Sequence, residues 1–351
     1  MKKIIDTFIP EAGHHCISNS LQQILHFNGY NISEEMIFGL SSGLGFIYFD
    51  IKNSPFPMIG GRINIGDFEE NLARRLNLGL QILETSSKKK GYEIIKSEIE
   101  NGKPAMIYVD MAYLKYLNLP PDAHFGGHSI IVFGLDEEEG IAYISDRDGE
   151  NFYVTANENE CPKDFHKISI EDLELAHSSK EKPYPPKNRL IKFDFSNASD
   201  TFSKQTLEEA IKKNLETFLS PPIKNIGVKG IKTFAENVVN WDKFSPEKQR
   251  AAAFNCFIMI SHIGGTGGGC FRKMYGNFLK EAYPFMQNDL FKIAGEEYIK
   301  ISLEWDKIAN MFKEISATLN QSLYQKISEK LFILYIRENE LMERIREVVC
   351  S

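Results

Sequence analysis

The sequence predicts an α+β fold, in which a helical lobe faces an antiparallel sheet, followed by a mostly α-helical C-terminal domain. Up to about residue 195, apolar residues with helical spacing alternate with short apolar runs of strand length. Beyond that point the apolar spacing is almost wholly helical. A chain of 351 residues is also too long for one ordinary hydrophobic core. We therefore expect two domains, at 1–195 and 196–351.

The elements of the first domain follow from this spacing. From Ile17 onward, apolar residues recur at i, i+4, i+7 and i+8, which predicts one buried helix face and a helix that begins near Cys16. Two further helices are expected at 67–78 and at about 91–101. Apolar runs bounded by turn residues predict strands at 105–109, 128–134, 141–145, 151–155 and 190–195.

The second domain has its own helix signals. Thr206 and Glu209 have the spacing of a capping box, so we expect them to open a helix that ends before Pro221. Ser245 and Pro246 open another helix, which extends to about residue 263. The longest helical patterns cover about 288–318 and 320–349, and the aromatic stripe of the first is interpreted as core.

Cys16 is the most informative residue because it combines a thiol with a predicted helix start. The N–H groups and the positive end of the dipole at a helix N-terminus favour a thiolate, and the thiolate is the attacking form of cysteine. We therefore interpret Cys16 as a catalytic nucleophile. The alternative is a small, buried hydrophobic residue.

A base and a carboxylate follow Cys16 in the chain. His128 begins a predicted strand, and Asp146 ends the next strand of the same hairpin. Side chains so placed meet across a sheet, where the carboxylate fixes the imidazole tautomer and stabilises its charged form. Singly, His128 is also explained as a core histidine and Asp146 as a turn residue, but the order and context of all three favour a Cys–His–Asp triad. Asp148 competes for the third role.

Composition excludes several classes of function. The net charge of −7 argues against nucleic-acid binding, and no stretch is apolar enough to span a membrane. The N-terminus has no long apolar core of a signal peptide. Five cysteines without a CxxC pair predict neither disulfides nor a zinc site, and the two carboxylates near residue 146 have no further metal ligand at suitable spacing. We expect a cytoplasmic protein without metal or cofactor.

A glycine-rich segment, Gly264–Gly269, lies between two predicted helices and is followed by Arg272. It is not a P-loop, because no Gly-Lys-Ser/Thr follows it. Its backbone N–H groups either form an anion-binding nest that helps to build an acyl or acceptor pocket, or they belong to a tight turn that needs positive φ angles.

These segments together resemble a known family. The first 195 or so residues are similar to the papain-like cysteine superfamily, and more narrowly to the butirosin biosynthesis protein H family. The resemblance is carried by the segments 13–21, 38–46 and 59–62, by those around His128 and Asp146, and by Gly265–Gly268 with Phe271, Arg272 and Tyr275. It therefore spans most of the chain.

The resemblance implies an acyltransferase of antibiotic biosynthesis. Members of the family are similar to enzymes that move an aminoacyl group from an acyl carrier protein to an aminoglycoside amine. The implied partners are a phosphopantetheine thioester on a carrier protein and a small-molecule amine, and the long C-terminal helices offer surface for a homodimer. The substrate-binding residues expected on this basis are Gly60, Gly61, Arg62, Gly267 and Arg272.

One departure from the papain-like pattern concerns the oxyanion hole. Papain-like enzymes usually place a glutamine a few residues before the nucleophile, and the segment 9–13 has none. His15 or His14 is the candidate second donor beside the Cys16 backbone N–H. The alternative for either histidine is to cap the helix or to pack.

The mechanism expected from the triad is double displacement. Cys16 takes the acyl group from the donor, His128 then deprotonates the incoming amine, and Asp146 holds the ring. Two other functions fit the same residues. A cysteine peptidase or amidase would use water as the acceptor, and a papain-like binding scaffold would leave Cys16 inert.

Overall fold

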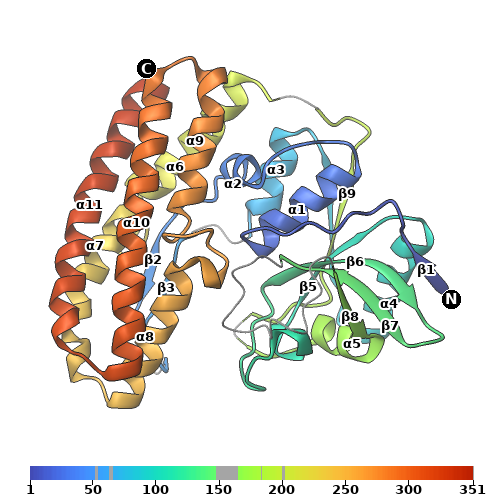
Figure 1. Ribbon diagram of the computed structural model, residues 1–351. Helices are drawn as coiled ribbons and strands as arrows, with labels where there is room; N and C mark the ends of the chain where they lie inside the picture. The colour runs from blue at the N-terminus through green and yellow to red at the C-terminus, as the bar shows by residue number, and fades with distance from the viewer. Residues whose placement is uncertain (52–53, 63–65, 148–164, 183, 200–201, 351) are drawn as a thin grey trace. The chain divides into compact units, whose positions relative to one another are not determined.

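A computed structural model describes residues 1–51, 54–62, 66–147, 165–182, 184–199 and 202–350 of the chain (Figure 1). It divides into two compact units. The first comprises Met1–Glu34 and Leu76–Asp200, and the second comprises Glu35–Arg75 and Thr201–Ser351. Residues 35–75 thus pack with the C-terminal helices, although they lie within the first of the two domains expected from sequence.

The first unit is built on an antiparallel sheet. Within the described residues its strands follow the order β4-β9-β5-β6-β7-β8, and β1 pairs with β6. The strands are β1 (Lys2–Ile4), β4 (Gly79–Leu83), β5 (Ala105–Val109), β6 (His128–Asp136), β7 (Ile141–Ser145), β8 (His166–Ser169) and β9 (Leu190–Asp194). Every residue of β6 is buried, so both faces of this central strand are covered.

The helices of the first unit cover this sheet. They are α1 (Cys16–Phe27), α4 (Lys88–Glu100) and α5 (Ile170–Ser178), with the short 3₁₀ helices η1 (Met111–Tyr113) and η2 (Lys115–Leu117). Helix α1 buries Ile17, Leu21, Ile24 and Leu25 and packs against β6 and β5. The helix expected to begin near Cys16 is therefore confirmed.

The second unit is mostly helical. It contains α3 (Phe68–Arg75), α6 (Lys204–Leu219), α7 (Gly227–Val238), η3 (Val239–Lys243), α8 (Pro246–Ile260), η4 (His262–Gly264), α9 (Arg272–Met286), α10 (Asp289–Thr318) and α11 (Ser322–Val349), with most of α2 (Glu34–Leu40) and the hairpin β2 (Ile47–Phe49) and β3 (Met58–Gly60). The hairpin joins the helices through backbone hydrogen bonds, from Tyr48 N to Asn225 O and from Gly227 N to Phe46 O. These contacts explain why residues 35–75 belong to this unit.

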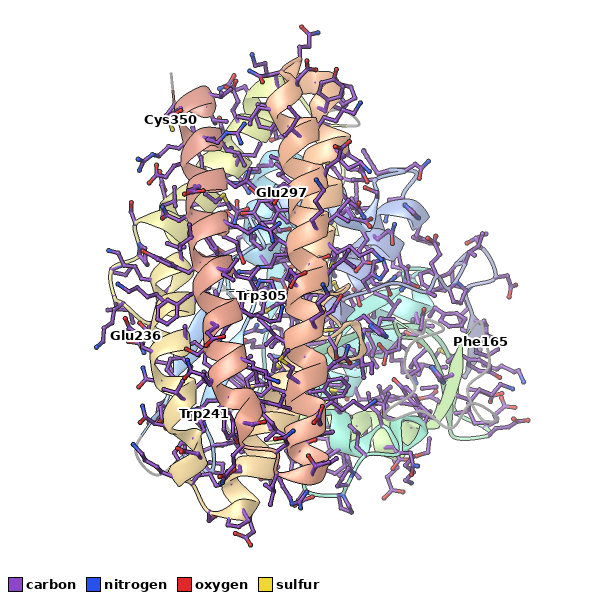
Figure 2. The ribbon with its side chains drawn as sticks, turned by 60° about the vertical axis from the view of Figure 1, so that its left-hand side comes forward. Phe165, Glu236, Trp241, Glu297, Trp305 and Cys350 are labelled. Atoms are coloured by element: carbon purple, nitrogen blue, oxygen red, sulfur yellow. The ribbon has the colours of Figure 1, made fainter. Side chains whose placement is uncertain are left out.

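Aromatic side chains form much of the core of the second unit. Figure 2 shows α10 and α11 side by side, with Trp305 on α10. The Phe312 ring lies 5.9 Å from the ring centroids of both Phe234 and Trp241. Trp305 and Phe312 are fully buried, which confirms that the stripe on the first long helix is core.

A buried ion pair crosses this core. The fully buried Arg272 guanidinium contacts the Glu338 carboxylate, with Nη2 at 3.0 Å and Nε at 3.1 Å from Oε2. Nη1 donates to the carbonyl oxygens of Gly45 and Cys270, and Trp305 Nε1 donates to Glu338. Nε and Nη1 are thus hydrogen-bonded, and Nη2 makes the ion-pair contact alone, so the buried charge faces an opposite charge.

The described structure supports the coarse fold class, an α+β region with an antiparallel sheet and then a mostly helical region. Of the expected strands, 151–155 lies outside the described residues. The strands β4 and β8 have no strong signal in the sequence. Strand β4 is an exposed edge, and β8 contains a single aliphatic residue, Ile168. No described helix is long and apolar enough to cross a membrane.

Two helix boundaries differ from expectation. The helix expected at 67–78 ends at Arg75, because Asn77 turns into a left-handed conformation with φ 53° before β4 begins. The capping box expected at Thr206 was wrong. Ser203 is the N-cap, and its hydroxyl accepts from the Thr206 N–H at 3.1 Å, so Thr206 occupies the third helical position.

The Arg272 ion pair leads to a stability prediction. Arg272→Met should lower the free energy of unfolding by about 3–5 kcal/mol, because it leaves the Glu338 charge buried without its partner. Adding Glu338→Leu should recover a large part of that loss. Urea denaturation followed by tryptophan fluorescence measures the second unit selectively, since Trp241 and Trp305 are the two tryptophans of the chain and both lie in it. Equal free energies of unfolding for Arg272→Met and for the double variant with Glu338→Leu would contradict the prediction.

Candidate active site

Cys16 is the first residue of α1, and His15 is the N-cap. The His15 backbone is extended, at φ −122° and ψ 131°, and its ring Nδ1 accepts from the Ser18 N–H at 3.3 Å. Cys16 remains partly exposed, whereas the following residue Ile17 is buried in the core. The thiol therefore lies at the positive end of the helix dipole, on a residue that keeps some exposed surface.

His128 and Asp146 meet across the β6–β7 hairpin. Ile131 pairs with Ser145, so Asp146 lies opposite a position two residues from His128 and on the same face of the sheet. His128 Nε2 and Asp146 Oδ2 are 2.7 Å apart, and both side chains are almost completely buried. The structure thus brings the predicted base and carboxylate into direct contact.

The remaining ring nitrogen of His128 completes the link to the nucleophile. Because Asp146 engages Nε2, Nδ1 is left for the side-chain hydrogen bond between His128 and Cys16. The backbone N–H of Ser129, the residue after the histidine, also hydrogen-bonds to the Cys16 sulfur. All three members of the predicted triad are therefore adjacent in the order Cys16, His128 and Asp146.

The electrostatics of the three groups favour an ion pair. Burial opposes the charge on His128, but the charges of Asp146 and Cys16 outweigh it and raise the pKa of the ring to about 10. Burial likewise opposes the Cys16 thiolate, yet His128, the Ser129 N–H and the Arg147 charge lower the pKa of the thiol below its usual value. The two shifts in pKa therefore both favour a thiolate beside an imidazolium.

Asp146 has two further donors that the sequence does not reveal. The Tyr116 hydroxyl donates to Oδ2 at 2.7 Å, and the Arg147 backbone N–H donates to Oδ1 at 2.7 Å. Burial raises the pKa of the Asp146 carboxyl, but His128 and these hydrogen bonds outweigh it and hold that pKa far below its usual range. Tyr116 precedes Asp146 by 30 residues on η2, and no motif connects the two.

Glu34 organises the loop in front of the nucleophile. Its carboxylate accepts from the backbone N–H of His14 at 2.7 Å and of His15 at 2.8 Å, and from the Ser18 hydroxyl at 2.7 Å. Burial raises the pKa of the carboxyl, and these hydrogen bonds oppose the rise. Arg147 Nη1 donates to the His14 carbonyl at 2.8 Å, so the loop is held from both sides.

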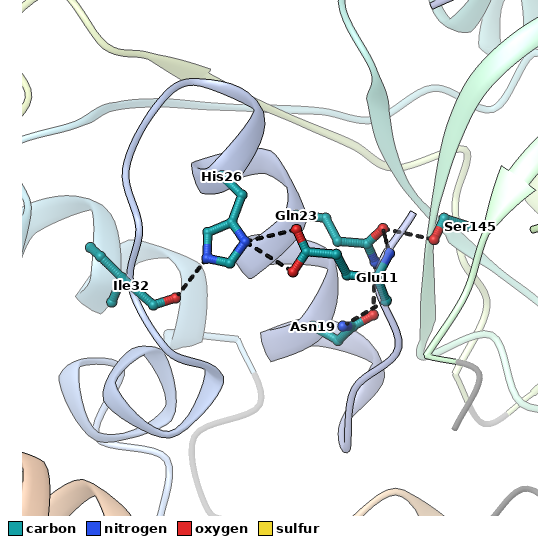
Figure 3. A network of polar contacts seen from close by, with 6 residues as sticks. All are labelled: Glu11, Asn19, Gln23, His26, Ile32 and Ser145. Atoms are coloured by element: carbon teal, nitrogen blue, oxygen red, sulfur yellow. Dashed lines mark hydrogen bonds and ion pairs between the residues drawn. The ribbon is translucent and has the colours of Figure 1, made fainter. Parts of the chain in front are cut away.

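A buried glutamine connects α1 to β7, the strand that directly precedes Asp146 (Figure 3). Gln23 Oε1 accepts from the Ser145 hydroxyl at 2.7 Å and from the Glu11 N–H at 3.2 Å, while Nε2 donates to Asn19 at 2.8 Å. Asn19 in turn donates to the Glu11 carbonyl. This glutamine follows the nucleophile instead of preceding it, and the network fixes the helix, the preceding segment and β7 together.

Further along α1, His26 fixes the same segment. Its Nδ1 lies 2.8 Å from Glu11 Oε1, and its Nε2 lies 3.2 Å from the Ile32 carbonyl oxygen (Figure 3). The segment before the nucleophile is therefore tied to α1 at Asn19, Gln23 and His26.

The two histidines before Cys16 have defined positions. Their backbone N–H groups are engaged by Glu34, so neither amide is a donor for an oxyanion. The His15 ring caps the helix, which was the alternative interpretation, and because Nδ1 accepts there, a neutral ring carries its proton on Nε2. The His15 ring caps the helix through Nδ1, and this leaves Nε2 to donate to an oxyanion. The role of His15 in the oxyanion hole therefore stays a prediction.

The expected substrate-binding residues belong to the second unit. Gly61 is needed there for packing, because a Cβ at this position would lie 2.6 Å from the Phe271 ring and 2.7 Å from the Cys270 carbonyl oxygen. The Arg62 guanidinium lies over the Phe68 ring, 4.2 Å from its centroid. Gly60 ends β3. A ligand-binding role for these residues stays a prediction.

The glycine-rich segment has the features of a tight turn. Gly267, Gly268 and Gly269 have φ angles of 65°, 100° and 56°. The Gly268 N–H donates to the Thr266 hydroxyl, and the Gly269 N–H donates to Asp306 at 2.9 Å, so these two amides already have acceptors inside the unit. They are therefore not available as the anion-binding nest considered from sequence.

Arg272, the last of the expected binding residues, is committed to the ion pair with Glu338 and has no exposed surface. Because of this burial, its guanidinium is not accessible to a ligand. Asp148, the competitor of Asp146, lies outside the described residues. Among the described residues, no group of three or more His, Cys, Asp or Glu side chains is arranged to hold a metal ion.

Comparison with known proteins identifies the family. Residues 15–147 match the family model butirosin biosynthesis protein H, N-terminal, and residues 171–345 match a domain of unknown function, DUF4872. The chain therefore contains a butirosin biosynthesis protein H N-terminal domain followed by a DUF4872 domain. The matched N-terminal domain contains Cys16, His128 and Asp146. The family is named for butirosin biosynthesis, which suggests a biosynthetic enzyme. No curated protein matches the chain at a significant level.

The lowered pKa of the Cys16 thiol predicts that this cysteine is reactive. Cys16 should react with iodoacetamide several-fold faster than free N-acetylcysteine at pH 7, with half-maximal reactivity below pH 9, because the pKa of the thiol is lowered. Cys256 and Cys270 should stay unlabelled, since burial raises the pKa of both, that of Cys270 to about 12. Peptide mapping by mass spectrometry measures each site, and labelling of Cys16 at the rate of the free thiol would contradict the ion pair.

Asp146→Asn tests the electrostatic link in the same assay. Removing this charge lowers the pKa of His128, so the imidazolium is lost at a lower pH and stabilises the Cys16 thiolate less. The half-maximal pH for alkylation should therefore move up. Asp172→Asn, on α5 and paired with Lys115, is the control and should leave the profile unchanged. A downward shift in Asp146→Asn would exclude this role for Asp146.

Proposed function

We propose that the protein is a cysteine-dependent acyltransferase with a papain-like catalytic fold. The observation that carries this proposal is the contact between the thiol of a partly exposed cysteine at a helix N-terminus, a buried imidazole and a buried carboxylate, in the chain order Cys16, His128 and Asp146. A nucleophile on a helix that packs against a sheet bearing the base and its partner supports the papain-like fold. The family name supports a place in natural-product biosynthesis.

In the first step the Cys16 thiolate attacks the carbonyl carbon of an acyl donor, for which we propose the phosphopantetheine thioester of an acyl carrier protein. A new carbon–sulfur bond forms to Cys16, and the donor carbon–sulfur bond breaks. The imidazolium of His128 gives its proton to the departing thiolate, which leaves as a thiol, and the ring becomes neutral. One thioester replaces another, so the step is nearly balanced in free energy.

In the second step a small-molecule amine attacks the acyl-cysteine. The carbon–nitrogen bond forms, the carbon–sulfur bond breaks, and Cys16 leaves as a thiolate. The neutral His128 ring takes the proton from the amine, which restores the ion pair. An amide is more stable than a thioester, so this step is downhill.

Both steps pass through an oxyanion that needs donors. The Cys16 backbone N–H, in the first turn of α1, is the first donor that we propose, since the amides of a helix start lack partners within the helix. His15 Nε2 is the second, because the contact of Nδ1 with the Ser18 N–H places the ring proton on Nε2. His14 is the alternative donor.

The central test uses a soluble thioester that mimics the donor. Incubation with an aminoacyl-N-acetylcysteamine should add the mass of the acyl group to Cys16, because an acyl-cysteine is the proposed intermediate. Intact-protein and peptide mass spectrometry measure the adduct. Cys16→Ala should carry none, and an adduct retained in that variant would exclude Cys16 as the acyl carrier.

The second half of the test separates transfer from hydrolysis. Adding a polyamine acceptor to the preformed acyl-enzyme should yield the amide faster than water yields the free acid. Chromatography with mass detection measures the two products. Release of the free acid alone, at a rate that the amine does not change, would support the peptidase or amidase. Absence of any adduct together with an unreactive Cys16 would support the binding scaffold.

A further inference from the structure

Tyr116 holds a defined position beside the triad. It lies on the single-turn helix η2, which ends where Asn118 adopts a left-handed conformation with φ 49°. The Tyr116 ring stacks on the ring of His166 from β8, with centroids 3.9 Å apart and an interplanar angle of 10°. His166 is almost completely buried, so the stack gives the tyrosine a fixed plane.

The Tyr116 hydroxyl and the catalytic ring share one acceptor. Asp146 Oδ2 accepts from the Tyr116 hydroxyl at 2.7 Å and lies 2.7 Å from His128 Nε2. The other carboxylate oxygen accepts from the Arg147 N–H at 2.7 Å. A donor on Oδ2 draws negative charge away from the contact with His128 and thereby weakens the hold of Asp146 on the ring proton.

We propose that Tyr116 is a positioning residue that limits how strongly Asp146 holds the proton on His128, so that the ring becomes neutral in the acyl-enzyme and accepts the proton of the amine. This inference rests on the proposed function and deepens it. The sequence shows no sign of it, because Tyr116 reaches Asp146 only through the fold.

The two halves of the reaction make different demands on His128. The thiolate of Cys16 and the carboxylate of Asp146 both favour the imidazolium before acylation. Once Cys16 carries an acyl group its charge is gone, and Asp146 is left as the anion in contact with the ring, with the Arg147 backbone and the Tyr116 hydroxyl as its other partners. The effect of Tyr116 should therefore be larger in the second half of the reaction than in the first.

Tyr116→Phe is the direct test, because it removes the hydroxyl and keeps the ring that stacks on His166. In a Cys16→Ala background, which lacks the thiolate as the acyl-enzyme does, adding Tyr116→Phe should raise the pKa of His128 by about one unit, since a hydrogen bond to a charged acceptor is lost. Titration of the His128 ring by NMR measures this without any substrate. An unchanged or lower pKa would overturn the proposal.

The kinetic readout uses the acyl-enzyme. In Tyr116→Phe, transfer to the amine at pH 7 should slow about tenfold and its pH midpoint should rise by about one unit. Formation of the acyl-enzyme should stay within about twofold, so the adduct should accumulate. A loss of acylation equal to the loss of transfer, with no shift of the pH midpoint, would show a purely structural role and overturn the proposal.

Tyr113→Phe is the matched control. Tyr113 lies on the neighbouring η1, and its ring is close to His124, 5.9 Å between centroids. The pKa of His128 by NMR and the pH midpoint of transfer should both be unchanged in Tyr113→Phe. A shift equal to that of Tyr116→Phe would show that the effect does not come from the Tyr116 hydroxyl, and would overturn the proposal. A raised pKa of His128 in Tyr116→Phe, in an enzyme that takes no acyl group from any thioester, would refute the proposed function and leave the electrostatic role of Tyr116 intact.

Discussion

The contact between His128 Nε2 and Asp146 Oδ2 is the interaction on which the rest of the site depends. It commits one nitrogen of the ring, so the other is left for Cys16. It also supplies the negative charge that allows a buried imidazolium to exist beside a thiolate. The contact is possible because two adjacent strands of one hairpin present both side chains on the same face. The chemistry of the thiol therefore depends on the register of β6 and β7.

Burying several charged groups in one place requires that each one is fully paired. The contacts of Asp146 with His128, Tyr116 and Arg147 meet this need at the carboxylate. Glu34 accepts hydrogen bonds from the backbone of the loop before Cys16, and Gln23 accepts one from Ser145, so the buried polar groups around the nucleophile also have partners. Such networks are rigid only when every member is satisfied, and a nucleophile that must meet an acyl carbon at close range benefits from that rigidity.

The second unit contains a buried ion pair of a different kind. Arg272 and Glu338 are completely enclosed, with Trp305 and backbone carbonyls as their remaining partners. In the sequence, an arginine that follows a glycine-rich segment looks the same whether it binds an anion or forms a buried ion pair. The distinction lies in burial, because Cys16 keeps exposed surface and Arg272 has none.

The sequence by itself determined the fold class of both halves, the helix that begins at Cys16, the strands that begin at His128 and end before Asp146, and the family. These features depend on local periodicity and on chain order, which a sequence contains directly. Only the tertiary structure decided the partners of those residues: Tyr116 on Asp146, Glu34 on the two amides before Cys16, Gln23 on Ser145, and Glu338 on Arg272. Each joins residues at least 19 positions apart, and such contacts form only when separate elements pack, so no local pattern encodes them.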